Sequence, residues 1–587
     1  MLKLFKKFKE KDLIILLICV ILIAFQVWLD LRLPEYMSKI TVLIKTEGSQ
    51  MSEILKNGGL MLLCALGSLL SAICVCYLTS SLSAGFSYKL RRDIFSKVES
   101  FGMEEVKKFK TSSLITRTTN DVTQIEMFIA MGLQMLIKAP IMAVWAVSKI
   151  LNKNIEWSLL TGAGVIILLI TIAIIFIIVF PRFEKIQKLI DRLNGVAREN
   201  LTGIRVIKAF NAEKFEEKRF EAVNKDLTAM QTFNQKCFAV LNPVMSLVMH
   251  FLTLGIYFVG AFLIDKANML DKLTIFSNMV VFSSYGMQVI SAFLMLALIF
   301  MILPRAGVSA RRINEILDQE VSVKDGNLNT NKLNEVGTVE FKDVSFKYPD
   351  SEEYLLENIS FKVNKGETIA FIGSTGSGKS TLVNLIPRFY DATSGEVLVD
   401  GVNVKDYTQV NLRNKIGYVP QRAVMFTGTV NSNVNYGYNG KKEPTKEKIK
   451  EAVKVSQAQE FVEKMENQYD ASIASGGTNI SGGQKQRLAI ARAIARNPEI
   501  YIFDDSFSAL DYKTDSKLRK ELKKYTGDAT VIIVAQRIGT IISADKIVVL
   551  DNGKCVGVGT HKQLLKTCDV YREIALSQIT EEELNYA

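Results

Sequence analysis

Six long apolar stretches occupy the first half of the chain and restrict the folds open to it. A membrane-spanning helix needs about 20 mainly apolar residues, and each stretch offers about that many. They cover residues 13–33, 58–82, 127–148, 157–180, 238–264 and 274–303. A signal peptide is the alternative for the first stretch, but its most apolar part runs into Trp28, Asp30 and Arg32 and no small-residue cleavage site follows. We therefore predict an α-helical transmembrane domain with six spans.

Basic residues collect in the polar segments on one side of these stretches. The rule that positive segments stay inside places such segments in the cytoplasm. We predict a multi-pass protein of the cell membrane, bacterial inner or plasma membrane, with a cytoplasmic N-terminus. The net charge of +12 could instead indicate a nucleic-acid partner. We expect none, because the chain has no basic patch interleaved with aromatic residues and no nucleic-acid module.

The long polar links between the spans are predicted to be helical. From Glu184 to Phe220, apolar residues recur at helical spacing and Gly and Pro are almost absent. The membrane helices are therefore expected to continue into the cytoplasm. Their inner turning points are predicted at Ser112 to Asp121 and at Arg205 to Phe210.

The second half of the chain has an α/β pattern. From Val336 onward, apolar strand-like runs alternate with helical segments, which indicates a largely parallel sheet covered on both faces. We predict a transmembrane domain over residues 1–315, a linker over 316–335 and an α/β domain over 336–587.

A glycine-rich segment follows an apolar strand and opens a helix, which is the context of a phosphate-binding loop. Backbone N–H groups of such a loop wrap phosphates, and its lysine reaches the β- and γ-phosphates. The Ser380 hydroxyl is a candidate ligand for Mg²⁺. The sequence therefore predicts ATP and Mg²⁺ as cofactors. The loop residues are Gly373, Ser374, Thr375, Gly376, Ser377, Gly378, Lys379, Ser380 and Thr381.

A second apolar strand, from Tyr501, ends in the acids Asp504 and Asp505. A carboxylate at the carboxyl end of a buried strand is suited to hold the Mg²⁺ of a phosphate-loop site. Asp504 is therefore a candidate metal residue, although an ordinary turn after a strand would give the same pattern.

The segment Ile480-Ser481-Gly482-Gly483-Gln484 lies between these two motifs. Its sequence and spacing resemble the LSGGQ signature of the ATP-binding-cassette (ABC) superfamily, and the resemblance covers essentially the whole chain. It implies an exporter-type six-span domain fused to a cytoplasmic α/β phosphate-loop domain. It also implies an ATPase coupled to transmembrane transport.

The resemblance implies further site residues. Tyr348 matches the aromatic residue that stacks on adenine, and Gln421 in YVPQ matches the Q-loop glutamine, which lies beside the Mg²⁺. In the family, two nucleotide domains close head to tail, so the signature of one chain contacts the ATP of the other. The signature residues expected to do so are Ser481, Gly482, Gly483 and Gln484. The segment ENLTGIRVIKAF resembles the second coupling-helix region of exporters.

Three positions depart from the family pattern. The usual general-base glutamate is Asp505 and the switch histidine is Gln536, while Ala474 to Gly477 replaces a Gly-Glu-Arg-Gly run. A carboxylate one methylene shorter retreats by about 1.5 Å, which costs about 10²-fold in rate. Glutamine cannot titrate near neutral pH. Asp505 and Gln536, the candidate catalytic residues, therefore resemble the degenerate site of heterodimeric exporters, with a slow homodimer as the alternative.

The polar residues of the sixth stretch, among them Ser277, Tyr285 and Gln288, either line a central cavity or join helices to one another. His250 in the fifth stretch is a functional candidate or a helix-joining group. A lightly polar, methionine-rich wall suits amphipathic molecules. We expect a small hydrophobic, amphipathic or lipid-like substrate and a second half-transporter subunit as partner. A lipid flippase and an ATP-gated channel or regulator stay open as alternatives.

Overall fold

The computed structural model describes residues 2–46, 48–151, 155–329, 336–437 and 443–578. The chain forms two compact units. One contains Met1–Glu99 and Thr111–Gln319, and the other contains Ser100–Lys110 and Glu320–Ala587. The predicted linker, residues 316–335, ends in positions outside the described residues, so the predicted domain boundaries stay predictions.

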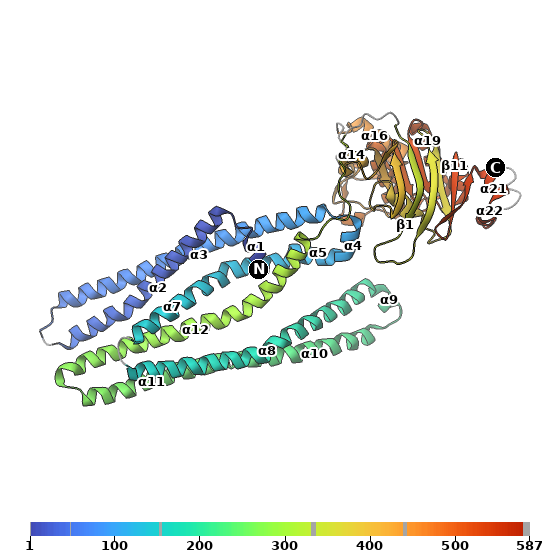
Figure 1. Ribbon diagram of the computed structural model, residues 1–587. Helices are drawn as coiled ribbons and strands as arrows, with labels where there is room; N and C mark the ends of the chain where they lie inside the picture. Colours follow the sequence, from blue (N-terminus) through green and yellow to red (C-terminus); the bar gives the residue numbers. More distant parts are fainter. Residues whose placement is uncertain (1, 47, 152–154, 330–335, 438–442, 579–587) are drawn as a thin grey trace. The chain divides into compact units, whose positions relative to one another are not determined.

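The first unit consists of long helices that run back and forth beside one another (Figure 1). Among the described residues, six helical segments of this unit are long and apolar enough to cross a membrane, and each contains one of the six predicted stretches. The predicted six-span fold is therefore confirmed. Its helices are α1 (Leu2–Phe5), α2 (Glu10–Lys45), α3 (Met51–Glu99), α5 (Thr111–Thr118), α6 (Asn120–Met127), α7 (Leu133–Leu151), α8 (Ile155–Thr202), α9 (Ile204–Ala209), α10 (Glu213–Ala239), α11 (Leu241–Lys266) and α12 (Met269–Leu317), with a π-helical turn at Phe128–Gly132.

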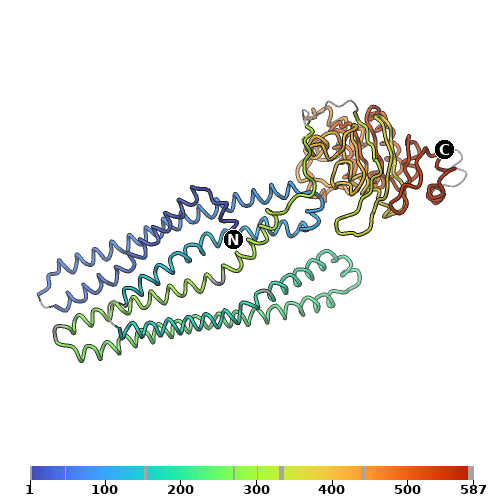
Figure 2. Tube along the Cα trace, in the orientation of Figure 1, coloured from blue at the N-terminus to red at the C-terminus, as the bar shows by residue number. Residues whose placement is uncertain are grey.

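The helices extend well beyond the apolar stretches. Helix α8 continues through Pro181 for 48 residues in all, about 72 Å at 1.5 Å per residue. The short helix α9 turns the chain into α10, as predicted for Arg205 to Phe210. The tube in Figure 2 follows this hairpin from α8 through α9 to α11.

The other predicted inner turn is wrong. Ser112 to Asp121 is mostly helical in α5 and α6, and the turn instead contains the short helix α4 (Met103–Phe109). Gly102 leads into α4 in an extended conformation, and Lys110 ends it at a φ of 56°. Polar residues of Ser112 to Asp121 are compatible with a helix, whereas these two flanking positions interrupt one.

Side chains of α12 bond to α2, which supports the helix-joining role of the polar residues in the sixth span. Ser277 bonds to Ser38, the Tyr285 hydroxyl donates to the Leu31 carbonyl at 3.0 Å, and Gln288 donates to the Asp30 carbonyl at 3.3 Å. These contacts satisfy the two hydroxyls and the amide N–H of Gln288, as polar groups within a bilayer require. The buried Oε1 of Gln288 has no hydrogen-bond partner among the described residues.

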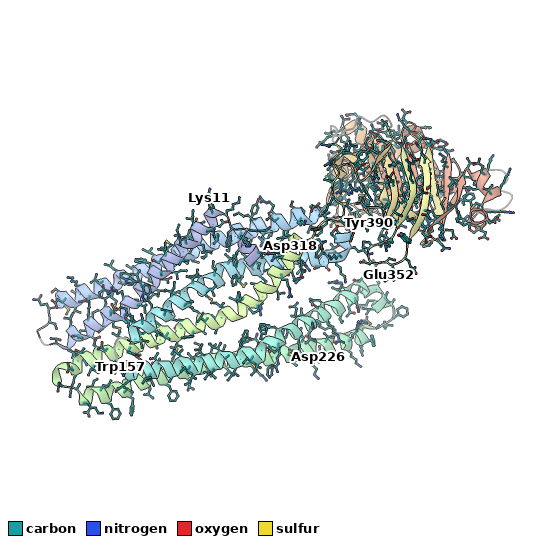
Figure 3. All side chains as sticks on the ribbon, in the orientation of Figure 1. Lys11, Trp157, Asp226, Asp318, Glu352 and Tyr390 are labelled. Carbon is teal, nitrogen blue, oxygen red and sulfur yellow. The ribbon has the colours of Figure 1, made fainter. Side chains whose placement is uncertain are left out.

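Two other polar or aromatic groups of the first unit have contrasting surroundings. Buried Trp157 on α8 (Figure 3) donates from Nε1 to the Ile256 carbonyl of α11 at 3.2 Å. His250 is exposed on α11 and has no hydrogen-bond partner among the described residues. Within this chain, His250 therefore does not join two helices.

The second unit is built on a ten-stranded sheet, in the order β5-β4-β1-β2-β12-β11-β3-β10-β9-β6. Strands β11, β3, β10, β9 and β6 are mutually parallel, and β5, β4, β1 and β2 form an antiparallel part. The strands are β1 (Val339–Phe346), β2 (Leu356–Val363), β3 (Thr368–Gly373), β4 (Ser394–Val399), β5 (Val402–Asn403), β6 (Ile416–Val419), β9 (Ile500–Asp504), β10 (Thr530–Val534), β11 (Lys546–Asp551) and β12 (Lys554–Gly559), with a separate pair of β7 (Gly428–Thr429) and β8 (Ser472–Ile473).

Both faces of the parallel strands are buried, because apolar side chains alternate between two cores. In β3, Ile369 and Phe371 belong to one core, and Ala370 and Ile372 to the other. This confirms the predicted α/β domain with a sheet covered on both sides. Its helices are α4, α13 (Lys379–Leu385), α14 (Gln409–Asn414), α15 (Val430–Val434), α16 (Lys446–Val455), α17 (Gln459–Lys464), α18 (Gly482–Ala495), α19 (Tyr512–Tyr525), α20 (Ile538–Ile541), α21 (His561–Thr567) and α22 (Asp569–Leu576).

Strand register places the candidate site at one edge of this sheet. Val534 of β10 pairs with Phe371 of β3 on one side and with Asp504 of β9 on the other. The carboxyl ends of three parallel strands therefore meet, and the segments that follow them carry the phosphate loop, the two acids and Gln536. Ligands bind at this edge in open parallel sheets.

Candidate ATP site

The phosphate loop joins β3 to α13, as the sequence predicts. A Cβ at Gly373 would lie 2.0 Å from the Leu550 carbonyl oxygen, and Gly378 has a φ of +91° with Leu356 2.6 Å from a built Cβ. Glycine is therefore required at both positions, at the first because the neighbouring backbone is too close and at the second because of the left-handed conformation.

Lys379 holds this loop together from within. Its Nζ donates to the carbonyl oxygens of Gly373 at 2.8 Å and Ser374 at 2.7 Å, and to the Ser377 hydroxyl at 3.2 Å. Burial lowers the pKa of Lys379, while the charges of Asp505 and Asp504 oppose that change. The ammonium is thus placed among the loop groups that would surround a bound phosphate.

Ser380 and Asp504, two of the predicted Mg²⁺ residues, contact each other directly. The Ser380 hydroxyl donates to Asp504 Oδ1 at 2.8 Å. Burial raises the pKa of Asp504 despite its hydrogen bonds from Ser380 and Tyr418. One hydroxyl and one carboxylate suit Mg²⁺, which takes few protein ligands and completes its shell with phosphate oxygens and water. No cluster of three or more His, Cys, Asp or Glu side chains suited to a metal occurs in the described parts of the chain.

The candidate catalytic residues are joined by one carboxylate oxygen. Gln536 Nε2 donates to Asp505 Oδ2 at 2.9 Å, and Gln421 Nε2 donates to the same oxygen at 3.3 Å. Asp505 is 7% exposed and has a φ of 47°. Both amides therefore occupy one oxygen of the carboxylate and hold it in place.

Tyr348 lies in a cluster of aromatic rings. Phe346 and Tyr390 meet it edge to face, with ring centroids 5.0 Å and 5.4 Å away, and its hydroxyl bonds to Thr381 at 2.9 Å. Lys107 of α4 places its Nζ 5.1 Å from the Tyr348 ring centroid. Tyr390 is labelled in Figure 3. Tyr348 is thus tied both to the phosphate-loop helix and to α4.

The signature residues begin helix α18. Ser481 caps it, since the Ser481 hydroxyl accepts from Gln484 N–H at 3.3 Å and Gln484 Oε1 accepts from Ser481 N–H at 2.8 Å. Ser481 and Gly482 are exposed. Before the signature, Gly476 and Gly477 have φ values of 65° and 64° in a short turn. This turn therefore depends on glycine at both positions. Gly476 stands where the family run has arginine, whereas Gly477 matches the last glycine of that run.

Comparison with known proteins decides the family. The sequence model described as ABC transporter matches residues 356–508, and the one described as ABC transporter transmembrane region matches residues 15–293. An uncharacterized ABC transporter ATP-binding protein of Mycobacterium tuberculosis is 39% identical over 527 residues, 89% of this chain and 87% of the relative. The chain belongs to the ABC transporter family.

Other relatives of this ABC transporter extend over similar lengths. The uncharacterized ABC transporter ATP-binding protein YfiB of Bacillus subtilis is 35% identical over 511 residues, 86% of each chain. YgaD of the same organism, named provisionally as a multidrug export ATP-binding/permease protein, is 32% identical over 496 residues, 83% of each chain. A solved bacterial Atm1-family ABC exporter with ATP bound has a TM-score of 0.83 and 24% identity, covering 97% of this chain and 100% of that one.

These findings confirm the predicted family and the exporter-type fold of this ABC transporter. Membership also establishes a multi-pass membrane protein that binds ATP and couples its hydrolysis to transport. The roles assigned to single residues stay predictions.

Three residues near the site were not predicted from the sequence. Tyr418 donates to Asp504 Oδ2 at 3.3 Å or to Asn384 Oδ1 at 3.0 Å, and burial raises its pKa. Tyr418 lies three positions before Gln421 in the YVPQ segment, so its place in the same motif could have predicted that it lies near the site. Lys107 and Tyr390 approach Tyr348 from distant parts of the chain, so no local pattern of the ABC transporter pointed to them.

Proposed function

We propose that this ABC transporter chain is one subunit of a heterodimeric exporter and that its own ATP site hydrolyses slowly. In this role Tyr348 stacks on adenine, the phosphate loop binds the phosphates, and Ser380, Asp504 and Gln421 surround Mg²⁺. The signature from Ser481 to Gln484 contacts the ATP of the partner subunit. Each of these assignments extends the family resemblance to residues of this chain.

The observation that carries the proposal is the contact among Asp505, Gln536 and Gln421. A general base must accept a proton from water, and its efficiency depends on reach and on free acceptor sites. Here the carboxylate is short, and two amides already donate to Asp505 Oδ2. Gln536 adds no titrating group. This site therefore favours holding ATP over activating water.

The proposed cargo is a hydrophobic or amphipathic compound moved outward by alternating access. The naming of YgaD as a provisional multidrug exporter supports this class. The clustered N-terminal lysines support a cytoplasmic N-terminus and a cytoplasmic ATP-binding domain. Transport is then strictly ATP-dependent and measurable as uptake into inverted vesicles. Flux that follows the gradient without hydrolysis would indicate the channel alternative, and uptake of lipid analogues alone would indicate a flippase.

The asymmetry is tested in the assembled complex by removing one acid at a time. Asp505→Ala is expected to reduce steady-state ATP turnover only modestly, while alanine in place of the partner's equivalent acid nearly abolishes it. Both variants should retain nucleotide binding, checked by photo-crosslinking of an ATP analogue. Equal and severe losses from the two substitutions would refute the asymmetric arrangement.

A further inference from the structure

The short segment from Gln536 to Ile538 connects the ATP site to α20, and one side chain that follows α22 bonds to it twice. The Gln578 amide Nε2 donates to the Gln536 carbonyl at 2.8 Å. The Oε1 of the same amide accepts from the Ile538 N–H at 2.9 Å. A single side chain, 40 positions further along the chain than Ile538, therefore fixes the backbone groups on both sides of Arg537.

The start of α20 needs such a partner. The first N–H groups of a helix have no acceptor within the helix itself. Arg537 stands at the cap position and makes no side-chain capping bond, because a guanidinium has donors and no acceptor. Gln578 Oε1 supplies the acceptor that Arg537 lacks. It therefore caps α20 from outside and holds the peptide groups next to Gln536 in one position.

Gln578 is exposed, but its backbone is held by a well-packed helix. Its N–H donates to the Ala575 carbonyl of α22 at 3.0 Å. Tyr571 and Ala575 of α22 are fully buried in the core that also contains Ile538, and the Tyr571 hydroxyl lies 2.7 Å from His561 Nδ1. Helix α22 contacts β11 and β3 and is labelled in Figure 1. The position of Gln578 is thus set by the same core that carries the sheet.

The backbone of Gln536 decides where its side chain can reach. On one side, the Ala535 N–H donates to the Phe371 carbonyl at 3.1 Å and fixes the end of β10. On the other side, the Gln536 carbonyl accepts from Gln578. Between these two fixed points, the Gln536 amide donates to Asp505 Oδ2 at 2.9 Å. The bond to Asp505 therefore depends on a backbone position that Gln578 holds.

We infer that Gln578 is a positioning residue of this ATP site. By holding the backbone of Gln536, it keeps the Gln536 amide on Asp505 Oδ2 and so helps to keep hydrolysis at this site slow. It acts through Gln536 and not on the nucleotide itself. The inference rests on the proposed function for its direction, slow hydrolysis, but the dependence of Gln536 on Gln578 can be measured separately.

The first test is single-turnover ATP hydrolysis in the assembled complex, with alanine in place of the partner's equivalent acid so that only this site reports. Gln578→Ala breaks both bonds and should raise the rate at saturating ATP about threefold, because Asp505 Oδ2 regains an acceptor site for water. The half-saturating ATP concentration should stay unchanged. Gln536→Ala should give a similar rise. The double variant should be no faster than either single variant, since both changes remove one contact.

Gln563→Ala is the matched control. Gln563 Oε1 accepts from the Thr560 N–H at 2.9 Å at the start of α21, so the same kind of bond is removed away from Gln536. The control should leave the single-turnover rate unchanged. An unchanged rate in Gln578→Ala would overturn the inference. Effects of Gln578→Ala and Gln536→Ala that multiply in the double variant would also overturn it, because Gln578 would then not act through Gln536.

The second test is amide hydrogen exchange in the same complex without ATP. A peptide covering residues 535–541 should exchange about tenfold faster in Gln578→Ala, while peptides from β3 and β10 and the Gln563→Ala control should not change. Unchanged exchange of residues 535–541 would refute the role of Gln578 whatever the rate of hydrolysis. Equal falls in rate in the two single variants, with no further fall in the double variant, would keep Gln578 as a positioning residue and overturn the proposed slow site instead.

Discussion

Asp505 and Gln536 are the two residues whose chemistry sets this ATP site apart, and they are joined at 2.9 Å. A longer carboxylate at position 505 and a titrating side chain at position 536 should together restore the activation of water. We predict that Asp505→Glu with Gln536→His raises single-turnover ATP hydrolysis at this site by about 10²-fold, while Asp505→Glu alone gives a smaller gain. The measurement is phosphate release from a complex whose other ATP site is inactivated. The shape-matched Asp505→Asn variant is the control, and a double variant no faster than the original chain would contradict the assignment.

Lys415 stabilises the same domain through buried ion pairs and takes no part in the proposed chemistry of the ATP site. Its Nζ lies 2.7 Å from Asp400 and 2.9 Å from Glu499, and its side chain is 3% exposed. Burial alone would lower the pKa of Lys415, but the hydrogen bonds to Asp400 and Glu499 outweigh it and raise that pKa. Lys415→Met leaves Asp400 buried and unpaired, a loss of about 3–5 kcal/mol. The apparent thermal midpoint of the full chain should fall by roughly 10 °C. Lys342→Met is the control, because its ion pair is exposed and long at 4.0 Å, and an equal shift in both variants would refute the argument.

Between elements, the packing of α2 against α7 contains an ion pair within the membrane-spanning part. Lys138 Nζ of α7 lies 3.7 Å from Asp30 Oδ2 of α2, and Ser68 of α3 donates to Asp30 Oδ1 at 2.5 Å. A charge left alone in this setting is costly. Asp30→Asn and Lys138→Met should each lower the apparent melting temperature in detergent. The double variant should lose less free energy of unfolding than the two single variants lose together, and the difference should be about 1–2 kcal/mol. Lys56→Met, at an exposed position of α3, is the neutral reference, and strictly additive losses would exclude the coupling.

Local sequence patterns predicted some elements of this fold and missed others. The six spans follow from apolar runs, because a bilayer demands long uninterrupted apolar helices. The phosphate loop follows from fixed glycine spacing between a strand and a helix. The inner turn at α4 did not follow, since the polar run after it is equally compatible with a turn and a helix. The charges of Asp30 and Lys138 were visible within two predicted spans, but only tertiary packing shows that they pair. The contact of Gln421 with Asp505 likewise depends on the register of β6, β9 and β10, which no local pattern encodes.

At the scale of the whole molecule, the N-terminus of α18 is exposed and available to contact a second subunit. Ser481 and Gly482 form an exposed helix start. Among the residues described, the hydrogen bonds of Ser481 go to the first turn of the same helix, to Gln484 and Lys485. Helix N-termini present N–H groups that favour anions. This arrangement agrees with the proposal that the signature completes an ATP site on a second subunit, where the missing glutamate and histidine are expected.

Gly482 allows that proposal to be tested without disturbing the fold. A Cβ built at Gly482 has no atom within 4 Å in this chain, and alanine at a first helical position is favourable. Gly482→Ala should therefore leave the thermal midpoint unchanged or slightly higher. If the phosphate of the partner's ATP approaches the backbone here, the added methyl lies in its path, and ATP turnover of the complex should fall at least tenfold. Gly539→Ala is the matched control, since its Cβ also meets nothing within 4 Å and it lies outside the signature. Full turnover by the Gly482 variant would mean that the signature of this chain does not contact the hydrolysed nucleotide, and the composite site would have to be abandoned.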